Sequence, residues 1–320
     1  MNDRPGPRSL ALSGGVGGAK LALGLTHAMD PARLMIVANT GDDFEHLGLS
    51  ICPDLDTLTY TLAGLANAGT GWGRADEGWR FMESLESLGG EKWFRLGDRD
   101  LALHVERTRR LATGEPLSRI TADICARLGI GAAIIPMSDD PVRTIVETAK
   151  GPLPFQHYFV REQCEPEVSG FHFGGANDAR PNRTFLKTLK DPALETIVIC
   201  PSNPFISIDP ILALPGVSSA LAASAAPRIA VSPIVGGRAL KGPTAKMMRE
   251  LGLPTDAIEI ARHYGKLLTG FVLDQTDAAL APAVESLGID VRVAETVMHS
   301  IDDKIALAET VLSFAHDLKR

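Results

Sequence analysis

The sequence predicts an α/β fold built on a doubly wound, mostly parallel, Rossmann-like sheet. Short apolar runs recur along the chain, and each of them ends in a polar or glycine-containing turn. Stretches with helical spacing follow most of these runs, and this alternation is typical of parallel sheets. The 320 residues are enough to bury a full core.

Each predicted element has its own sequence signal, taken here in chain order. The predicted strands are residues 10–12, 34–39 (LMIVAN), 131–136 (GAAIIP), 196–200 (TIVIC), 228–232 (RIAVS) and 270–273. Continuous apolar runs of this length are typical of strands buried on both faces. The predicted helices are residues 19–29, 56–65, 101–112, 118–128 and 302–318. Leu58, Leu62 and Leu65, for example, share one face of the second helix.

One segment, residues 143–173, interrupts the alternation of strands and helices. It is richer in β-branched and aromatic residues and has turn signals at Gly151-Pro152 and Ser169-Gly170. We predict a small β-containing insertion that caps the site. Residues 1–142 and 174–320 then form the Rossmann-like core.

The composition excludes several classes of protein. Hydrophobic residues make up 45% and charged residues 22%, as in ordinary globular proteins. A net charge of −7 argues against a nucleic-acid partner but allows a local basic pocket. Residues 1–8 lack the apolar core of a signal peptide, and no uninterrupted apolar run reaches about 18 residues, which predicts a cytoplasmic protein without a membrane partner. The four cysteines have no C-x-x-C spacing and are interpreted as reduced, mostly structural thiols.

A glycine-rich turn at residues 13–20 (SGGVGGAK) indicates a phosphate site. Its small residues let backbone N–H groups approach a phosphate, and the helix that follows points its positive end at the same place. The turn is not a P-loop, because Ala19 and Leu21 flank Lys20, and Lys20 itself occupies the third glycine position of a dinucleotide fingerprint. The alternative is a strand–helix turn that binds no ligand.

Four carboxylates form the second constellation, namely Asp42, Asp43, Asp54 and Asp56. Paired carboxylates near a phosphate site suit Mg²⁺, which prefers oxygen ligands and bridges phosphate oxygens. The alternatives are a helix cap for Asp56 and a solvated turn for Asp43.

Residues 95–100 (RLGDRD) form the third constellation. Arg95 or Arg99 can neutralise phosphoryl charge, whereas the alternative is a helix start capped by Asp98 or Asp100. The three tryptophans lie within residues 72–93 and suit either a planar ligand or a core. The loops 138–140, 202–203 and 236–237 follow predicted strands and either line the same cleft or form plain turns. His27, His46 and His104 form no ligand spacing, and we find no covalent nucleophile signature.

Together these motifs resemble the 2-phospho-L-lactate transferase family of coenzyme F-420 biosynthesis. The resemblance spans nearly the whole chain and rests on residues 13–20, 39–43 (NTGDD), 51–57 (ICPDLDT) with Tyr60, 96–100 (LGDRD), 136–142 (PMSDDPV), 201–204 (PSNP), 231–235 (VSPIV) and 242–243 (GP). A neighbouring family of UDP-sugar-binding regulators shares the glycine loop and the Asp-Asp turn. Phe44-Glu45-His46 and the CPDLDT phrase favour the transferase.

The resemblance implies a reaction and a set of site residues. The ribityl hydroxyl of Fo (7,8-didemethyl-8-hydroxy-5-deazariboflavin) attacks the phosphate that carries a three-carbon acid on a guanosine diphosphate, and GMP leaves. It implies Asp42 and Asp54 as ligands of Mg²⁺, with Arg95 as a further catalytic residue. It implies Asp56, Arg95 and Asp98 at the Fo site. The implied nucleotide- and phosphate-binding residues are Ser13, Gly14, Gly15, Gly17, Gly18, Lys20, Asn39, Ser202 and Asn203.

Two questions stay open in the sequence. The acid is phospholactate, phosphoenolpyruvate or phosphoglycerate, which differ by details of a pocket. The alternative function is a non-catalytic UDP-sugar-binding regulator of the related fold. The family also implies a homodimer.

Overall fold

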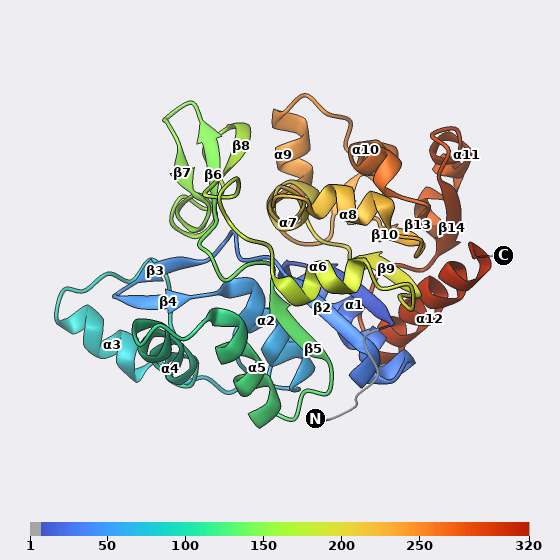
Figure 1. Ribbon diagram of the computed structural model, residues 1–320. Helices are drawn as coiled ribbons and strands as arrows, with labels where there is room; N and C mark the ends of the chain where they lie inside the picture. The colour runs from blue at the N-terminus through green and yellow to red at the C-terminus, as the bar shows by residue number, and fades with distance from the viewer. Residues whose placement is uncertain (1–7, 320) are drawn as a thin grey trace.

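The computed structural model describes residues 8–319, so the predictions for residues 1–7 lie outside the described chain. Its centre is a seven-stranded sheet in which every pair is parallel (Figure 1). In spatial order the strands are β14 (Asp290–Ala294), β13 (Gly270–Asp274), β10 (Arg228–Val231), β9 (Thr196–Ile199), β1 (Ser9–Ser13), β2 (Leu34–Ala38) and β5 (Ala133–Pro136). The predicted α/β fold with a parallel sheet is confirmed.

The order of the strands determines where a ligand can bind. The chain runs outward from β1 through β2 to β5, returns to β9 on the other side of β1, and then runs outward to β14. The direction of winding therefore reverses between β1 and β9, which are paired in register at Leu12 and Ile199. In open α/β sheets a ligand binds at the carboxyl ends of the strands at such a reversal. In this chain that point lies beside Ser13 and Ser202.

Alternate side chains of the buried strands enter two separate cores. In β1, Leu10 and Leu12 pack in one core and Ala11 in the other. The helices α1 (Gly15–Ala28), α2 (Pro53–Leu62), α5 (Leu117–Arg127) and α12 (Ile301–Asp317) cover the face of Ala11. The helices α6 (Arg183–Leu189), α7 (Asp209–Leu212), α8 (Val217–Ala223), α9 (Thr244–Glu250) and α10 (Ala257–Tyr264) cover the opposite face.

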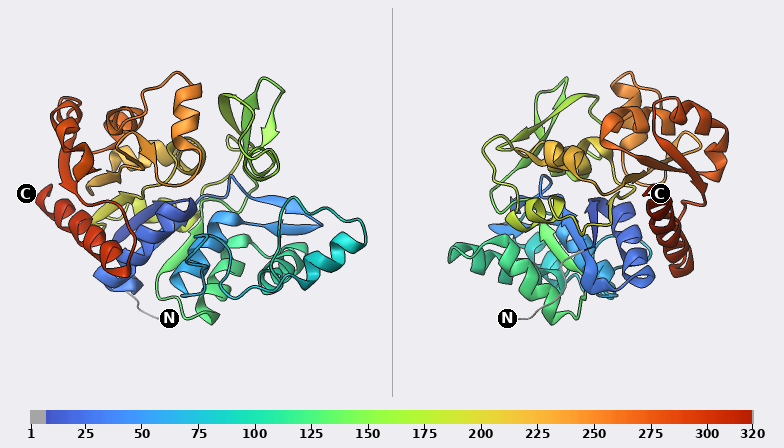
Figure 2. Two further views of the ribbon diagram at one scale, coloured as in Figure 1. Left: turned by 180° about the vertical axis from the view of Figure 1, so that it is seen from behind. Right: turned by 45° about the vertical axis from the view of Figure 1, so that its right-hand side comes forward.

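Helices α1 and α12 cross closely, and they lie side by side in both views of Figure 2. A Cβ atom on Gly24 would lie 2.0 Å from the carbonyl oxygen of Lys304. Glycine at this position therefore serves helix packing rather than a ligand.

The fold has further helices and short strands. They are the hairpin β3 (Phe44–His46) and β4 (Leu49–Ile51), the helices α3 (Arg80–Ser87), α4 (Asp100–Ala112) and α11 (Ala281–Glu285), and the two-residue strands β11 (Ile234–Val235) and β12 (Arg238–Ala239). The β3–β4 hairpin and β14 were absent from the sequence prediction. The alternating polar residues of β14 fit an edge strand, which a search for continuous apolar runs misses.

Two predicted helix starts are wrong, and both errors bear on the site. Helix α1 begins at Gly15 instead of residue 19, so most of the glycine-rich turn is its first turn. Helix α2 begins at Pro53 instead of residue 56, with Cys52 as its N-cap residue. Asp54 and Asp56 thus both lie in the first turn of α2, and the capping alternative for Asp56 is wrong.

The segment predicted as an insertion forms an antiparallel three-stranded sheet. Strand β6 (Arg143–Thr148) pairs with β7 (Leu153–Pro154) and with β8 (Val168–Gly174). A helical turn, His157–Arg161, connects β7 to β8. In Figures 1 and 2 this sheet stands beside α9 and above the β3–β4 hairpin. A capping role for this sheet stays a prediction.

Within residues 8–319 no single helix has the length and apolar character needed to cross a membrane. Among these described residues, one pair of segments bent by 85°, Pro204–Leu212 with Val217–Ala223, passes that test together, and many of its apolar side chains are buried in the core. The four cysteines are all free, as predicted.

Candidate active site at the carboxyl ends of the central strands

The glycine-rich turn is pressed against the segment that follows β9. The Gly14 amide donates to the Ser202 hydroxyl over 3.2 Å, and that hydroxyl donates to the Gly14 carbonyl over 2.8 Å. A Cβ atom on Gly17 would lie 2.4 Å from the Pro201 carbonyl oxygen, and one on Gly18 would lie 2.6 Å from Ser202 Oγ. These glycines are therefore required by packing. Gly15 has a positive φ of 65° and open space where a Cβ atom would lie.

Asp54 ties the start of α2 to the start of α1. Its Oδ1 accepts from the Gly15 amide over 2.6 Å, and its Oδ2 accepts from Asn39 Nδ2 over 2.9 Å. Asn39 is fully buried, and its side chain also accepts from the Gly41 amide over 2.8 Å and donates to the Ile206 carbonyl over 3.2 Å. Asn39 thus shapes the turn that carries Asp42. A direct contact between Asn39 and a nucleotide stays a prediction.

Asp42 lies close to Asp54 and is also buried. Its Oδ1 has no hydrogen-bond partner within residues 8–319. Burial and the charge of Asp54 raise the pKa of Asp42 well above its usual value. Burial likewise raises the pKa of Asp54 to about 6. Each of two neighbouring buried carboxylates disfavours the charged form of the other, and a divalent cation between them would stabilise both charges.

The pair fits Mg²⁺ in particular. The described residues contain no group of three or more His, Cys, Asp and Glu side chains suited to a metal ion. Mg²⁺ does not require such a cage, because it retains several waters and is bound through one or two carboxylates together with substrate phosphates. Asp42 and Asp54 supply that number of carboxylates.

Asp43 lies near Cys52, Arg143 and Arg107. It is buried, so the alternative of a solvated turn is wrong. Burial raises its pKa to about 7, and Cys52, Arg143 and Arg107 oppose that rise.

These carboxyl groups predict how stability depends on pH. The folded-state pKa values of Asp43 and Asp54 lie above the roughly 3.9 of an unfolded aspartate. The folded protein thus holds protons that the unfolded chain has released, and this contribution to stability is lost as pH rises from about 4 to about 7. In urea unfolding without Mg²⁺, we expect a lower free energy of unfolding at pH 8 than at pH 5. The double variant Asp43→Asn/Asp54→Asn should reduce the difference, and an unchanged difference would contradict the assignment.

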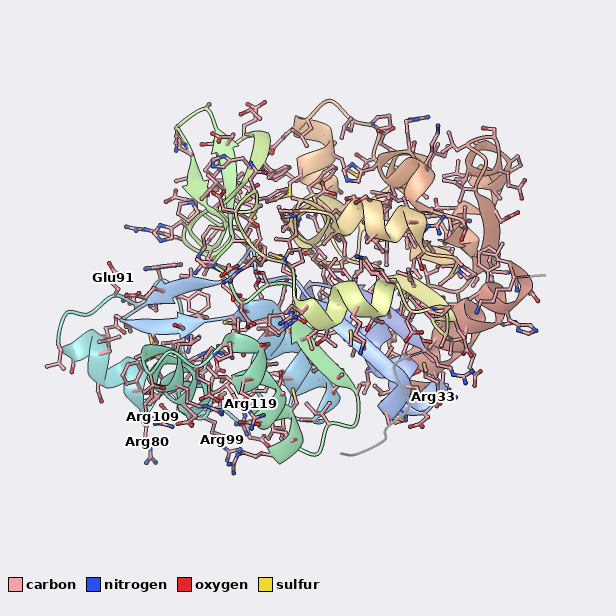
Figure 3. All side chains as sticks on the ribbon, viewed as in Figure 1. Arg33, Arg80, Glu91, Arg99, Arg109 and Arg119 are labelled. Carbon is pink, nitrogen blue, oxygen red and sulfur yellow. The ribbon has the colours of Figure 1, made fainter. Side chains whose placement is uncertain are left out.

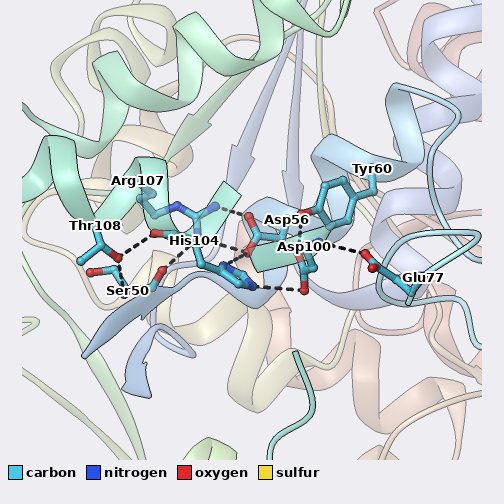
Figure 4. Close-up of polar contacts among 8 residues, drawn as sticks. All are labelled: Ser50, Asp56, Tyr60, Glu77, Asp100, His104, Arg107 and Thr108. Atoms are coloured by element: carbon cyan, nitrogen blue, oxygen red, sulfur yellow. Dashed lines mark hydrogen bonds and ion pairs between the residues drawn. The ribbon is translucent and has the colours of Figure 1, made fainter. Parts of the chain in front are cut away.

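Figure 4 shows a largely buried ionic network formed by Asp56, Asp100, His104 and Arg107. The guanidinium of Arg107 binds both carboxylate oxygens of Asp56 and donates to the Ser50 carbonyl over 3.2 Å. His104 lies between two carboxylates, with Nδ1 3.7 Å from Asp56 and Nε2 3.1 Å from Asp100. Although burial raises the pKa of Asp100, its contacts with His104 and with the Tyr60 hydroxyl hold that pKa below the usual value. The predicted Fo-site residue Asp56 is thus engaged by Arg107.

Asp100 connects this network to a cavity of about 280 Å³. The lining residues are Asn67, Thr70, Trp72, Gly73, Arg74, Asp76, Glu77, Trp79, Arg95, Gly97 and Asp100. The guanidinium of Arg95 lies 3.9 Å from the centre of the Trp79 ring. Two of the three tryptophans, Trp72 and Trp79, therefore lie at this cavity. The third, Trp93, packs against His46 and His157.

Three predicted ligand-binding residues already have partners within the protein. Asp98 accepts from the amides of Arg80 and Phe81 and so caps α3. Lys20 donates to the Met298 carbonyl over 2.7 Å, and Asn203 accepts from the Phe205 amide over 3.0 Å. Their contacts with substrates stay predictions. The loop at Ser138–Asp140 is tied to Arg180 as a turn.

The sequence interpretation missed His104 and Arg107, and it gave Asp100 only the role of a cap. A signal was present, because Asp100, His104 and Arg107 follow the i, i+4, i+7 spacing of a single helix face. A charged residue on the buried face of a helix requires a partner. Glu77 carried no such signal, because it reaches the network by accepting from the amides of Arg99 and Asp100.

Comparison with known proteins identifies the family. Residues 10–305 match the family model described as 2-phospho-L-lactate transferase CofD. The chain is 40% identical over 318 residues to a phosphoenolpyruvate transferase of Streptomyces griseus, covering 98% of this chain and 99% of that protein. It is 37% identical over 303 residues to a 2-phospho-L-lactate transferase of Methanosarcina acetivorans, covering 95% and 97%.

A solved structure has the same fold. It is protein BH3568 from Bacillus halodurans, with a TM-score of 0.61 at 15% identity, covering 96% of this chain and 99% of that one. That likeness concerns the fold alone, whereas the sequence matches concern the family. The chain belongs to the 2-phospho-L-lactate transferase (CofD) family and is a phosphoacid transferase of coenzyme F-420 biosynthesis.

Proposed function

We propose that the protein transfers a phospho-(three-carbon acid) group from a guanosine diphosphate-linked donor to the ribityl hydroxyl of Fo. The hydroxyl oxygen forms a bond to the acid-bearing phosphorus, and the bond from that phosphorus to the bridging oxygen breaks. GMP leaves with the bridging oxygen, and the hydroxyl proton is released. The product is F-420-0 or its dehydro or glyceryl relative.

One observation carries this proposal: the carboxylate pair Asp42 and Asp54 and the tryptophan-lined cavity flank the same helix start. We propose that the planar acceptor binds in this cavity, and we name it the acceptor cavity. Asp54 is bonded to the first residue of α1, and Gly71, in the loop that lines the cavity, packs against Val16, the second residue of α1. A diphosphate at this helix terminus would lie between the two sites. Phosphoryl transfer depends mainly on positioning and charge neutralisation, and this arrangement suits both.

Each group of site residues has a separate role in the proposed reaction. Asp42 and Asp54 would hold Mg²⁺, which when bound neutralises charge on the phosphates. The amides of α1 that follow Gly15 would orient the diphosphate, while Trp79 and Arg95 would offer a flat face and a cation to the planar acceptor. Tyr60 and His104 keep Asp100 ionised in the cavity wall, where it can accept a hydrogen bond from the acceptor.

We propose that the acid is phosphoenolpyruvate, so that the product is dehydro-F-420-0. The similarity to phosphoenolpyruvate transferases of Streptomyces griseus and Kitasatospora aureofaciens supports this choice. The lactyl and glyceryl donors are the competing substrates to be compared.

Arg95→Ala is expected to raise the KM for Fo by about tenfold, because a cation–aromatic contact near the ligand is worth about 1 kcal/mol or more. The KM for the donor should stay within about twofold. Arg99→Ala is the matched control, because Arg99 lies four residues away and projects outward from the molecule (Figure 3). An effect of Arg95→Ala confined to the donor would assign Arg95 to the other site.

Thermal unfolding with ligands tests the donor class. In the presence of Mg²⁺ we expect GDP to stabilise the protein, by roughly 2.7 kcal/mol at a hundredfold excess over its Kd. UDP-N-acetylglucosamine should not do so. Stabilisation by the UDP-sugar alone would instead support the regulator, which the family match disfavours.

A further inference from the structure

A lysine from the opposite half of the sheet reaches over the start of α1. Lys241 follows the β11–β12 hairpin, and its Nζ donates to the Thr70 carbonyl over 2.7 Å, across 171 positions of sequence. Thr70 lies in the glycine-rich loop 66–76, which provides much of the wall of the acceptor cavity. Lys241 therefore joins the loop after β12 to the acceptor side of the site.

Gly71 shows how close this junction lies to the helix start. It has a positive φ of 78°, and a Cβ atom there would lie 2.7 Å from Lys241 Nζ and 2.9 Å from Val16 Cγ1. The ammonium group of Lys241 and the side chain of Val16 thus both lie within 3 Å of the position that a Cβ atom on Gly71 would occupy. Val16 and Lys20 are four residues apart and share a face of α1.

The charges around this junction are mainly positive. The charges of Lys241 and Lys304 both lower the pKa of Lys20, whereas the charge of Asp303 raises it. Asp303 already accepts from the backbone amides of His299 and Ser300. No carboxylate is paired with Lys241 within residues 8–319. In a chain with a net charge of −7, these ammonium groups form a local site for a polyanion.

We propose that Lys241 is a clamp that binds the diphosphate of the donor and, through Thr70, holds loop 66–76 in place as the wall of the acceptor cavity. This inference rests on the proposed function for the identity of the donor. An ammonium group has three N–H donors, so one can remain on the Thr70 carbonyl while the others bind phosphate oxygens. Donor binding then orders the acceptor cavity, and the two substrates bind with positive coupling.

Two measurements on four proteins test the clamp. Calorimetry with Mg²⁺ and GDP gives the nucleotide Kd, and hydrogen exchange followed by mass spectrometry reports the order of loop 66–76. For Lys241→Met we expect about a tenfold weaker Kd, together with faster exchange in the loop both with and without GDP. Lys241→Arg should keep a cation at the junction and stay within about threefold of the wild type in both measurements.

Lys304→Met is the matched control. It removes another ammonium group whose charge lowers the pKa of Lys20, while the hydrogen bond from Lys241 to Thr70 remains. Its loop exchange should equal that of the wild type. An unchanged Kd or unchanged loop exchange in Lys241→Met would overturn the clamp. A wild-type protein that does not bind GDP would instead contradict the proposed function, so the two failures are distinguishable.

Discussion

Replacing Asp42 by Asn is expected to lower kcat by about a thousandfold or more while the protein stays folded. The variant removes one of the two carboxylates that would hold Mg²⁺, and metal neutralisation of transferring phosphate is worth several kcal/mol. The buried, unpartnered Oδ1 of Asp42 has no other evident use in the described structure. Steady-state turnover at increasing Mg²⁺ concentration measures the effect.

Stability gives an independent signature of the same role. Burial and Asp54 disfavour the charged form of Asp42, so Asp42→Asn should unfold at a higher temperature than the wild type near pH 8 without metal. Mg²⁺ with GDP should stabilise the wild type much more than the variant. Asp290→Asn, at an exposed edge-strand position, is the control and should change neither property. Near-normal turnover of Asp42→Asn at saturating Mg²⁺ would refute the metal role.

Replacing Arg107 by Met is expected to destabilise the protein by about 3–5 kcal/mol, because it leaves Asp56 buried without its cation. The loss should appear as a lower midpoint of urea unfolding with an unchanged slope. Arg109→Met is the matched control on the same helix, since the exposed Arg109 pairs with Glu106 at the surface. That variant should keep nearly the wild-type midpoint of urea unfolding, because exposed ion pairs contribute little to stability.

A second variant tests the cause of the loss. Asp56→Leu/Arg107→Met removes both charges and should recover much of the stability lost in Arg107→Met alone. A double variant no more stable than Arg107→Met would show that the ion pair is not the source. Recovered stability without recovered activity would show that turnover needs these two charged side chains for more than folding.

The sequence predicts most of the central sheet because its buried strands are largely apolar runs. Residues 196–199 and 228–231 are examples, and both lie in the sheet as expected. The strand β14 and the hairpin β3–β4 lack such runs, because each is partly exposed and its pairing depends on a distant or neighbouring strand. Local patterns do not encode that pairing.

The site was predictable where residues close in sequence act together. The glycine turn and Asp42 fall at strand ends, so the topology brings them to the same edge of the sheet. The bond between Asp54 and Gly15 and the contact between Lys241 and Thr70 join segments far apart in the chain. No spacing rule reveals such contacts. The packing role of Gly17 also required the structure, since its neighbour is the carbonyl of Pro201.

Direct product analysis is the most immediate test of the proposed transferase. Purified protein is mixed with Mg²⁺, Fo and equal amounts of the enolpyruvyl, lactyl and glyceryl guanosine diphosphate donors, and the products are followed by liquid chromatography and mass spectrometry. We expect GMP and dehydro-F-420-0 to form together in equal amounts, ahead of the other two products, and to be absent with Asp42→Asn. Failure to form GMP or any F-420-0 relative from all three donors would contradict the proposed transfer.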